Sequence, residues 1–178
     1  MNTRRHVLLA LLAGSAVLPG CASPQVSDYA QERPSLELDR YFTGRVLAHG
    51  VFQKRGGEVA RRFTVVMDCH WEGNQGVLDE AFSYSDGTTG RRIWRLTRHA
   101  DGRITGTADD VVGEAEGHTA GNTFRWKYTL QLPVDDKVYE VQFDDWMVLI
   151  DERVMLNRAT MTKFGLRLGE VTLSFTKR

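Results

Sequence analysis

The alternation of apolar and polar residues over positions 123–132 constrains the fold more than any other feature of this chain. Its apolar members are Phe124, Trp126, Tyr128, Leu130 and Leu132, and each residue between them is polar or charged. Successive side chains of a β-strand point to opposite faces, so this pattern predicts a strand with one buried face and one face in water. Strands of this kind are typical of antiparallel sheets.

Similar stretches follow one another along most of the chain. Alternating segments occur at 78–84, 138–150 and 171–175, and turn signals such as Ser85-Asp86-Gly87 and Asp101-Gly102 separate them. We predict about eight to ten strands and no long amphipathic helix, which indicates a β-sandwich or a closed barrel. The many aromatic and glycine residues favour the barrel, because closure removes exposed edges. The expected fold is all-β, a single antiparallel barrel over residues 36–178.

The N-terminus has the layout of a bacterial lipoprotein signal peptide. Arg4 and Arg5 precede a short apolar run, and the sequence Leu18-Pro19-Gly20 leads into Cys21. We expect residues 1–20 to be removed and Cys21 to carry the lipid that anchors the protein to a membrane. The apolar run is too short to span a bilayer, which needs about 20 residues. Paired arginines occur in both general and twin-arginine export signals, so the export route stays open.

Two further expectations concern the mature N-terminus. Ala22 and Ser23 follow the lipidated cysteine where an aspartate would retain it at the inner membrane, so by the enterobacterial sorting rule we expect the outer membrane, facing the periplasm. Residues 21–35 are polar and contain prolines, which predicts a flexible tether between the anchor and the barrel.

Composition excludes several classes of function. Without Arg4 and Arg5 the mature chain has 21 basic and 23 acidic residues, which gives no electrostatic basis for binding nucleic acid. The sequence holds no H-E-x-x-H, C-x-x-C, phosphate-loop or nucleophile-elbow pattern, and its histidines are isolated from one another. We therefore expect no cofactor and no metal site.

Cys69 is the only cysteine besides Cys21, so no disulfide within the mature chain is expected. It falls on the apolar face of the stretch 63–71, together with Phe63 and Trp71. On that face a cysteine acts as a small apolar residue, so we expect Cys69 to be buried and inert rather than nucleophilic.

Polar residues on apolar faces are the sharpest functional signal. Asp145 alternates with apolar residues of the stretch 138–150, and Glu80 lies between Leu78 and Phe82. A buried carboxylate needs a partner, or its pKa rises. The same pattern places Arg92, Asn157 and Lys163 on apolar faces, while Asp110, in an adjacent aspartate pair, is ambiguous.

Two interpretations of these residues remain open. They can be satisfied salt bridges that close one end of the barrel. Alternatively, they orient a polar head group or act as general acid and base.

A set of motifs in fixed order also resembles a known family. These motifs are Tyr41-Phe42-x-Gly44, Leu78-x-Glu80-x-Phe82-x-Tyr84-x-Asp86-Gly87, Arg92-x-Trp94, Gly106-x-Ala108-x-Asp110-Val111-x-Gly113-x-Ala115, Phe143-Asp144-Asp145-Trp146, Asn157 and Lys163-Phe164-Gly165. Together they resemble the DUF3833 family, proteobacterial lipoproteins of unknown function. The resemblance implies a lipocalin-like barrel but supplies no catalytic residues. Family members often lie near genes for enzymes that resemble cyclopropane-fatty-acid synthases, which implies a lipid-related role.

Three functions fit these observations. The preferred hypothesis is a lipid-anchored barrel that binds a small hydrophobic or amphiphilic molecule, because barrels of about eight strands can hold one small ligand. The alternatives are docking onto a membrane complex through an apolar patch, and an enzyme for envelope lipids with Glu80 and Asp145 as acid and base. The candidate binding or catalytic residues are Glu80, Arg92, Trp94, Asp110, Trp126, Asp145, Trp146, Asn157 and Lys163.

Overall fold

The computed structural model describes residues 23–134 and 136–178. The predicted signal peptide, residues 1–20, and the predicted lipidation site, Cys21, lie outside the described residues. In the part of the chain that is described, no helix is long and apolar enough to cross a membrane.

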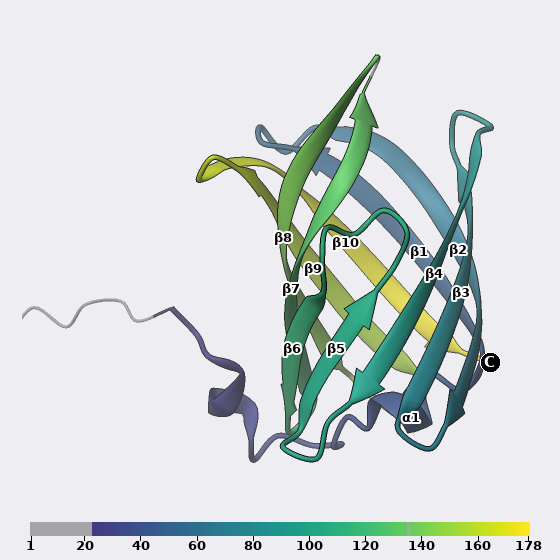
Figure 1. The fold of residues 1–178 in the computed structure, drawn as a ribbon, viewed down its shortest axis with the longest axis vertical. Coiled ribbons are helices and arrows are strands. Elements are labelled where there is room, and N and C mark those ends of the chain that lie inside the picture. Colours follow the sequence, from purple (N-terminus) through teal and green to yellow (C-terminus); the bar gives the residue numbers. More distant parts are fainter. Residues whose placement is uncertain (1–22, 135) are drawn as a thin grey trace, which may run out of the picture.

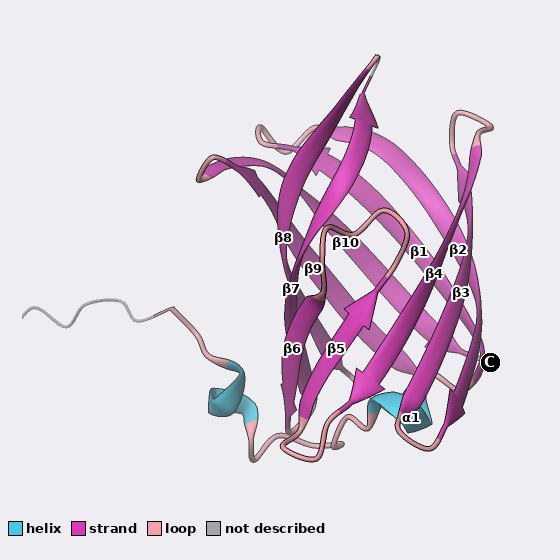
Figure 2. Cartoon of the chain, in the orientation of Figure 1, coloured by secondary structure: helices cyan, strands magenta, loops and turns pink. Residues whose placement is uncertain are grey.

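The described residues form ten antiparallel strands that close into one barrel (Figures 1 and 2). The strands are β1 (Gly44–Lys54), β2 (Val59–Glu72), β3 (Gln75–Tyr84), β4 (Thr89–Arg98), β5 (Arg103–Thr107), β6 (Ala115–Ala120), β7 (Thr123–Val134), β8 (Lys137–Leu149), β9 (Val154–Lys163) and β10 (Leu166–Lys177). Each strand pairs with the next one in the sequence, and β1 pairs with β10 to complete the circle. The predicted all-β, lipocalin-like barrel is confirmed.

The alternation predicted from the sequence sets which side chains face inward. On β7, Phe124, Trp126 and Leu130 are buried, while Lys127 and Gln131 are exposed. On β8 the buried residues include Asp145, as the pattern predicts, and the register places it opposite Trp126. Inward-facing positions of neighbouring strands therefore meet at the same height inside the barrel.

One end of the barrel is closed by the segment before β1. The short helix α1 (Leu38–Tyr41) lies across this end, the lower one in Figure 1, and buries Leu38 and Tyr41. Phe42 packs edge-on against Phe175 of β10, with ring centroids 5.9 Å apart. The hydroxyl of Tyr41 donates a hydrogen bond of 3.0 Å to the carbonyl oxygen of Arg153, which fixes the helix to the β8–β9 turn.

The half of the barrel next to α1 is filled with apolar side chains. Val46, Met67 and Met155 are fully buried there. Cys69 belongs to this core, as predicted, and burial raises the pKa of its thiol to about 12. The thiol is therefore protonated at neutral pH and is a poor nucleophile.

The segment expected to be a flexible tether packs partly on the barrel wall. Val26–Tyr29 forms a short 3-10 helix (η1) that contacts β6 and β7. The ring of Tyr29 meets the edge of Trp146 at 6.0 Å between centroids, and the backbone N–H of Leu36 donates to the carbonyl oxygen of Gly121 at 2.8 Å. Residues 23–35 thus differ from the expected free tether, because Tyr29 supplies an aromatic contact within an otherwise polar stretch.

Candidate functional site

The other half of the barrel contains a cavity of about 520 Å³. Its lining comes from β1–β4 and β7–β10, and it is predominantly apolar. Val134, at the β7–β8 hairpin, is part of the lining and is 51% exposed. The cavity therefore reaches the hairpin end of the barrel, opposite α1.

Aromatic rings form much of the cavity wall. Trp94 and Trp126 lie with ring centroids 4.5 Å apart, and Tyr128 stacks on Phe143 with centroids 5.1 Å apart. Apolar pockets with a few placed polar groups are the usual form of small-molecule sites.

Asp145 is the centre of one polar cluster in this wall. Its carboxylate accepts hydrogen bonds of 3.1 Å from the indole Nε1 of Trp126 and of 3.1 Å from the hydroxyl of Tyr128. It also accepts a hydrogen bond from the amide Nδ2 of Asn157, which additionally donates to the carbonyl oxygen of Trp146 at 3.2 Å. Asp145 and Asn157 are 4% and 2% exposed, so this cluster is almost completely removed from bulk water.

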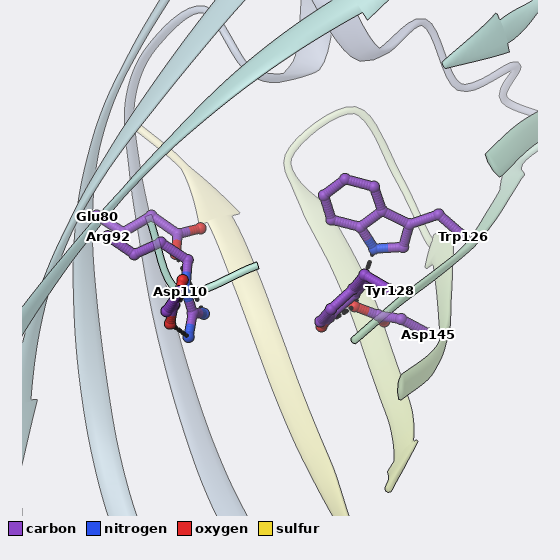
Figure 3. Close-up of polar contacts among 6 residues, drawn as sticks. All are labelled: Glu80, Arg92, Asp110, Trp126, Tyr128 and Asp145. Atoms are coloured by element: carbon purple, nitrogen blue, oxygen red, sulfur yellow. Dashed lines mark hydrogen bonds and ion pairs between the residues drawn. The ribbon is translucent and has the colours of Figure 1, made fainter. Parts of the chain in front are cut away.

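Arg92 is the centre of a second polar cluster, on β3, β4 and the β5–β6 loop (Figure 3). Its Nε and Nη2 donate to the carboxylate of Asp110, the shorter bond being 2.6 Å. Its Nη1 lies 3.9 Å from Oε2 of Glu80, an ion pair without a hydrogen bond. The three charged groups come from positions far apart in the sequence.

Burial changes the protonation of both carboxyl groups that face the cavity. Desolvation raises the pKa of Asp145 from its ordinary value of 3.8 to about 6, although its three hydrogen bonds lower it. Desolvation likewise raises the pKa of Glu80 from 4.5 to about 7, and the nearby Arg92 only partly opposes this. Burial also disfavours the charge of Arg92, but Asp110 and Glu80 outweigh that effect and raise its pKa.

Most of the candidate residues predicted from the sequence come together in this half of the barrel. Six of them line the cavity: Glu80, Arg92, Trp94, Trp126, Asp145 and Asn157. Asp110 joins them through its bonds to Arg92. Lys163 lies at the end of β9, with its Nζ 4.3 Å from the ring centroid of Tyr139, and is not part of the lining.

Trp146 requires a correction. It was a candidate binding residue of the barrel interior, but it follows the inward-facing Asp145 on β8 and so faces outward. The guanidinium of Arg125 lies 4.4 Å from its ring centroid, and Arg125 also pairs with Asp144 at 2.6 Å. Trp146 therefore contacts the outer surface and the η1 segment rather than the cavity.

Two polar lining residues were missed by sequence reasoning. Arg61 was not among the candidate residues, yet it lines the cavity with its Cζ 3.6 Å above the ring centroid of Tyr84. The signal was present, because Arg61 alternates with the inward-facing Phe63 and Val65. Tyr128 was expected only as an apolar wall residue, and its hydrogen bond to Asp145 was not predicted.

The described part of the chain has no group of three histidine, cysteine, aspartate or glutamate residues that could hold a metal ion. The polar groups that line the cavity include two carboxyl groups, two arginines and an amide, set in an apolar, aromatic wall.

Comparison with known proteins assigns the family. The family model described as "Protein of unknown function (DUF3833)" matches residues 15–177, nearly the whole chain. The chain belongs to the DUF3833 family. No curated protein matches this DUF3833 member.

Two solved structures share the barrel of this DUF3833 protein. An S-type phycobiliprotein lyase from Guillardia theta is similar with a TM-score of 0.60 and 9% identity, covering 87% of this chain and 98% of the lyase. A protein of unknown function from the DUF3598 family of Nostoc punctiforme is similar with a TM-score of 0.56 and 12% identity. That match covers 83% of the DUF3833 chain and 51% of the Nostoc protein. At these identities the likeness shows the fold alone.

Proposed function

We propose that this protein binds one small hydrophobic or amphiphilic molecule inside the barrel. The observation that carries the proposal is the cavity of about 520 Å³, which is open at the hairpin end and lined mainly by apolar and aromatic side chains. Its volume lies within the range of about 300–1,000 Å³ that is usual for ligand pockets. The apolar part of the ligand packs against Trp94, Trp126 and Phe143, and its polar end lies near Glu80 and Asp145.

The arrangement of the two halves supports this proposal. A barrel with only a structural role gains stability by filling its interior, as the half next to α1 does. The other half leaves apolar walls unfilled and keeps four acidic or basic side chains, Glu80, Arg92, Asp145 and Arg61, along them. An apolar ligand would supply the missing packing contacts.

A cavity-filling substitution tests the proposal. N-phenyl-1-naphthylamine, an uncharged apolar dye that fluoresces when it leaves water, is titrated into the purified domain beginning at Ser23. The expected result is saturable binding of one dye per protein. Ala159 is 3% exposed and lines the cavity, so Ala159→Phe fills it and weakens dye binding at least tenfold.

Leu156→Phe is the matched control, because Leu156 lies on the same strand but is 46% exposed on the outer wall. This variant should bind the dye as the wild type does. Circular dichroism checks that each variant is folded, and Met161→Trp replaces Ala159→Phe if the latter does not fold. Absence of saturable binding, or equal binding by the cavity and control variants, would contradict the proposal.

We further propose that Cys21 carries the lipid that holds this barrel in the cell envelope, at the outer membrane facing the periplasm. The support is the order of charged, apolar and small residues before Cys21. Cells expressing the full chain are labelled with radioactive palmitate. The label should be lost in Cys21→Ser. It should be retained in Cys69→Ser, because Cys69, the only other cysteine of the chain, is buried. Label that persists in Cys21→Ser would overturn this assignment.

A further inference from the structure

We propose that the ligand of this cavity has a polar end that donates hydrogen bonds, a hydroxyl or an ammonium group, and that anionic head groups are excluded. The inference rests on the proposed binding function and names the chemical class of the ligand. It comes from three features of the cavity: which donors are already engaged, which acceptors are open, and which charges are paired.

The polar donors of the Asp145 cluster are engaged within the protein. Trp126 Nε1 and the hydroxyl proton of Tyr128 are directed at Oδ2 of Asp145. Asn157 Nδ2 is directed at Oδ1 of Asp145 and at the carbonyl oxygen of Trp146. Because both of these neighbours are acceptors, the amide of Asn157 is fixed with its nitrogen toward them. A ligand acceptor would have to compete with the carboxylate for each of these donors.

The cavity holds open acceptors, whereas its unpartnered donors, Nε of Arg61 and Nη1 of Arg92, belong to arginines that already pair with aspartates. No described residue donates a hydrogen bond to the carboxylate of Glu80, whose side chain is 12% exposed and whose nearest cationic nitrogen is 3.9 Å away. The carbonyl oxygen Oδ1 of Asn157, also in the lining, is buried and has no hydrogen-bond partner. Buried polar atoms without a partner are uncommon in folded proteins and are costly. A donor on the ligand would satisfy the acceptor that faces the cavity, Glu80.

The charged side chains of the lining also favour a neutral donor or a cation over an anionic head group. Each arginine of the lining has an aspartate of its own, since Arg61 pairs with Asp86 at 2.8 Å and Arg92 with Asp110 at 2.6 Å. Glu80 shares Arg92 with Asp110 and lies farther from it, at 3.9 Å, and no described cation pairs with Asp145. Electrostatic interactions are strong in a buried, apolar space, so a carboxylate or phosphate on the ligand would be repelled there, while an ammonium would be attracted.

Three amphiphiles with the same tail test the inference. Dodecanol, dodecylamine and dodecanoate, all below their aggregation limits, compete with N-phenyl-1-naphthylamine for the wild-type domain at pH 8.5. The equal tails make the apolar contribution the same, so the order of affinities reports the head group. We expect the alcohol and the amine to bind at least tenfold more tightly than dodecanoate.

Glu80→Gln identifies the residue responsible. Without this carboxylate the amine should bind more weakly relative to the alcohol than it does in the wild type, and dodecanoate should bind less weakly. Glu140→Gln, at an exposed position of β8, should leave the relative affinities of the three probes unchanged. Dodecanoate binding as tightly as the alcohol and the amine would overturn the inference while leaving the proposed function in place. Absence of saturable binding by the dye and by all three probes would instead remove the proposed function.

Discussion

At the scale of single residues, the cavity is defined by two carboxyl groups held in different ways. Asp145 is surrounded by neutral donors and is nearly inaccessible to water, whereas Glu80 has a distant arginine and an open face. Burial raises the pKa of both groups, so both bind a proton more tightly in the folded protein than in the unfolded chain.

The raised pKa values of Asp145 and Glu80 in the folded state predict how the free energy of unfolding depends on pH. Since the folded state holds more protons, the free energy of unfolding falls as pH rises from about 4, near the ordinary pKa values, through the raised values of about 6 and about 7. For Asp145 the loss between pH 5 and pH 8 is on the order of 1 kcal/mol. Asp145→Asn has no titrating carboxyl group at this position and lacks this loss. From pH 5 to pH 8, the free energy of unfolding measured in urea should therefore rise by about 1 kcal/mol in Asp145→Asn relative to wild type.

Asp136→Asn serves as the control, because Asp136 is an exposed residue of the β7–β8 turn. Its free energy of unfolding should differ from that of the wild type by the same small amount at both pH values. If Asp145→Asn behaved in the same way, Asp145 would not be a buried carboxylate of the cavity.

At the scale of elements, the β5–β6 loop links the filled half of the barrel to the cavity. Asp110 in this loop forms the bidentate ion pair with Arg92 on β4. The loop is also fixed to β7, since the backbone N–H of Gln131 donates to the carbonyl oxygen of Asp110 at 2.8 Å. The loop therefore helps to set the electrostatic environment of Glu80 on β3.

Removing the charge of Asp110 should lower the pKa of Glu80. In Asp110→Asn a repelling carboxylate disappears, and Arg92 is left with Glu80 as its carboxylate partner; both changes favour the ionised form of Glu80. The measurement is a carbon-13 NMR titration of the Glu80 carboxyl group. Asp109→Asn, at the exposed neighbouring position, should leave this titration unchanged. A Glu80 titration that stays the same or moves upward in Asp110→Asn would show that the loop does not act on Glu80.

The short strand β6 supports the aromatic wall through a glycine. A Cβ atom at Gly117 would lie 2.3 Å from Cβ of Trp126 and 2.4 Å from the carbonyl oxygen of Arg125, so the backbones of β6 and β7 could not keep their spacing. Gly117→Ala should lower the free energy of unfolding by about 1–3 kcal/mol and shift the tryptophan fluorescence.

The matched control for Gly117→Ala lies in the β1–β2 turn. A Cβ at Gly56 would meet no atom within 4 Å, so Gly56→Ala should change the free energy of unfolding by at most about 0.5 kcal/mol. Equal effects of the two substitutions would mean that β6 and β7 are not packed as closely as described.

The elements also show what the sequence could and could not predict. Alternation predicted the strands and the inward direction of Asp145, because the period of two is a local property of strand geometry. The same rule, applied consistently, excludes Trp146 from the interior and includes Arg61 in it. The contacts between Arg92 and Asp110, and between Tyr128 and Asp145, depend on the register between strands and on a loop conformation, which no local pattern specifies.

At the scale of the whole molecule, the barrel consists of a filled half next to α1 and a hollow half at the hairpin end. The sequence predicted closure and strand number within its stated range, because ten regularly spaced strands have few other ways to cover their edges. It could not predict whether the interior is filled or hollow. That property depends on how large side chains from eight separate strands divide the inner volume, and only the assembled barrel determines it.

The central claim is that the hollow half holds one apolar or amphiphilic molecule, and native mass spectrometry tests it most directly. The domain beginning at Ser23 is exported behind a cleavable secretion signal and purified gently from the periplasm, and its intact mass is recorded before and after solvent extraction. The predicted result is an added mass at near one-to-one ratio in the wild type that extraction removes. It should be absent from Ala159→Phe and present in Leu156→Phe. An unmodified protein mass in the wild type, together with no uptake when lipid extract is added back, would contradict the account.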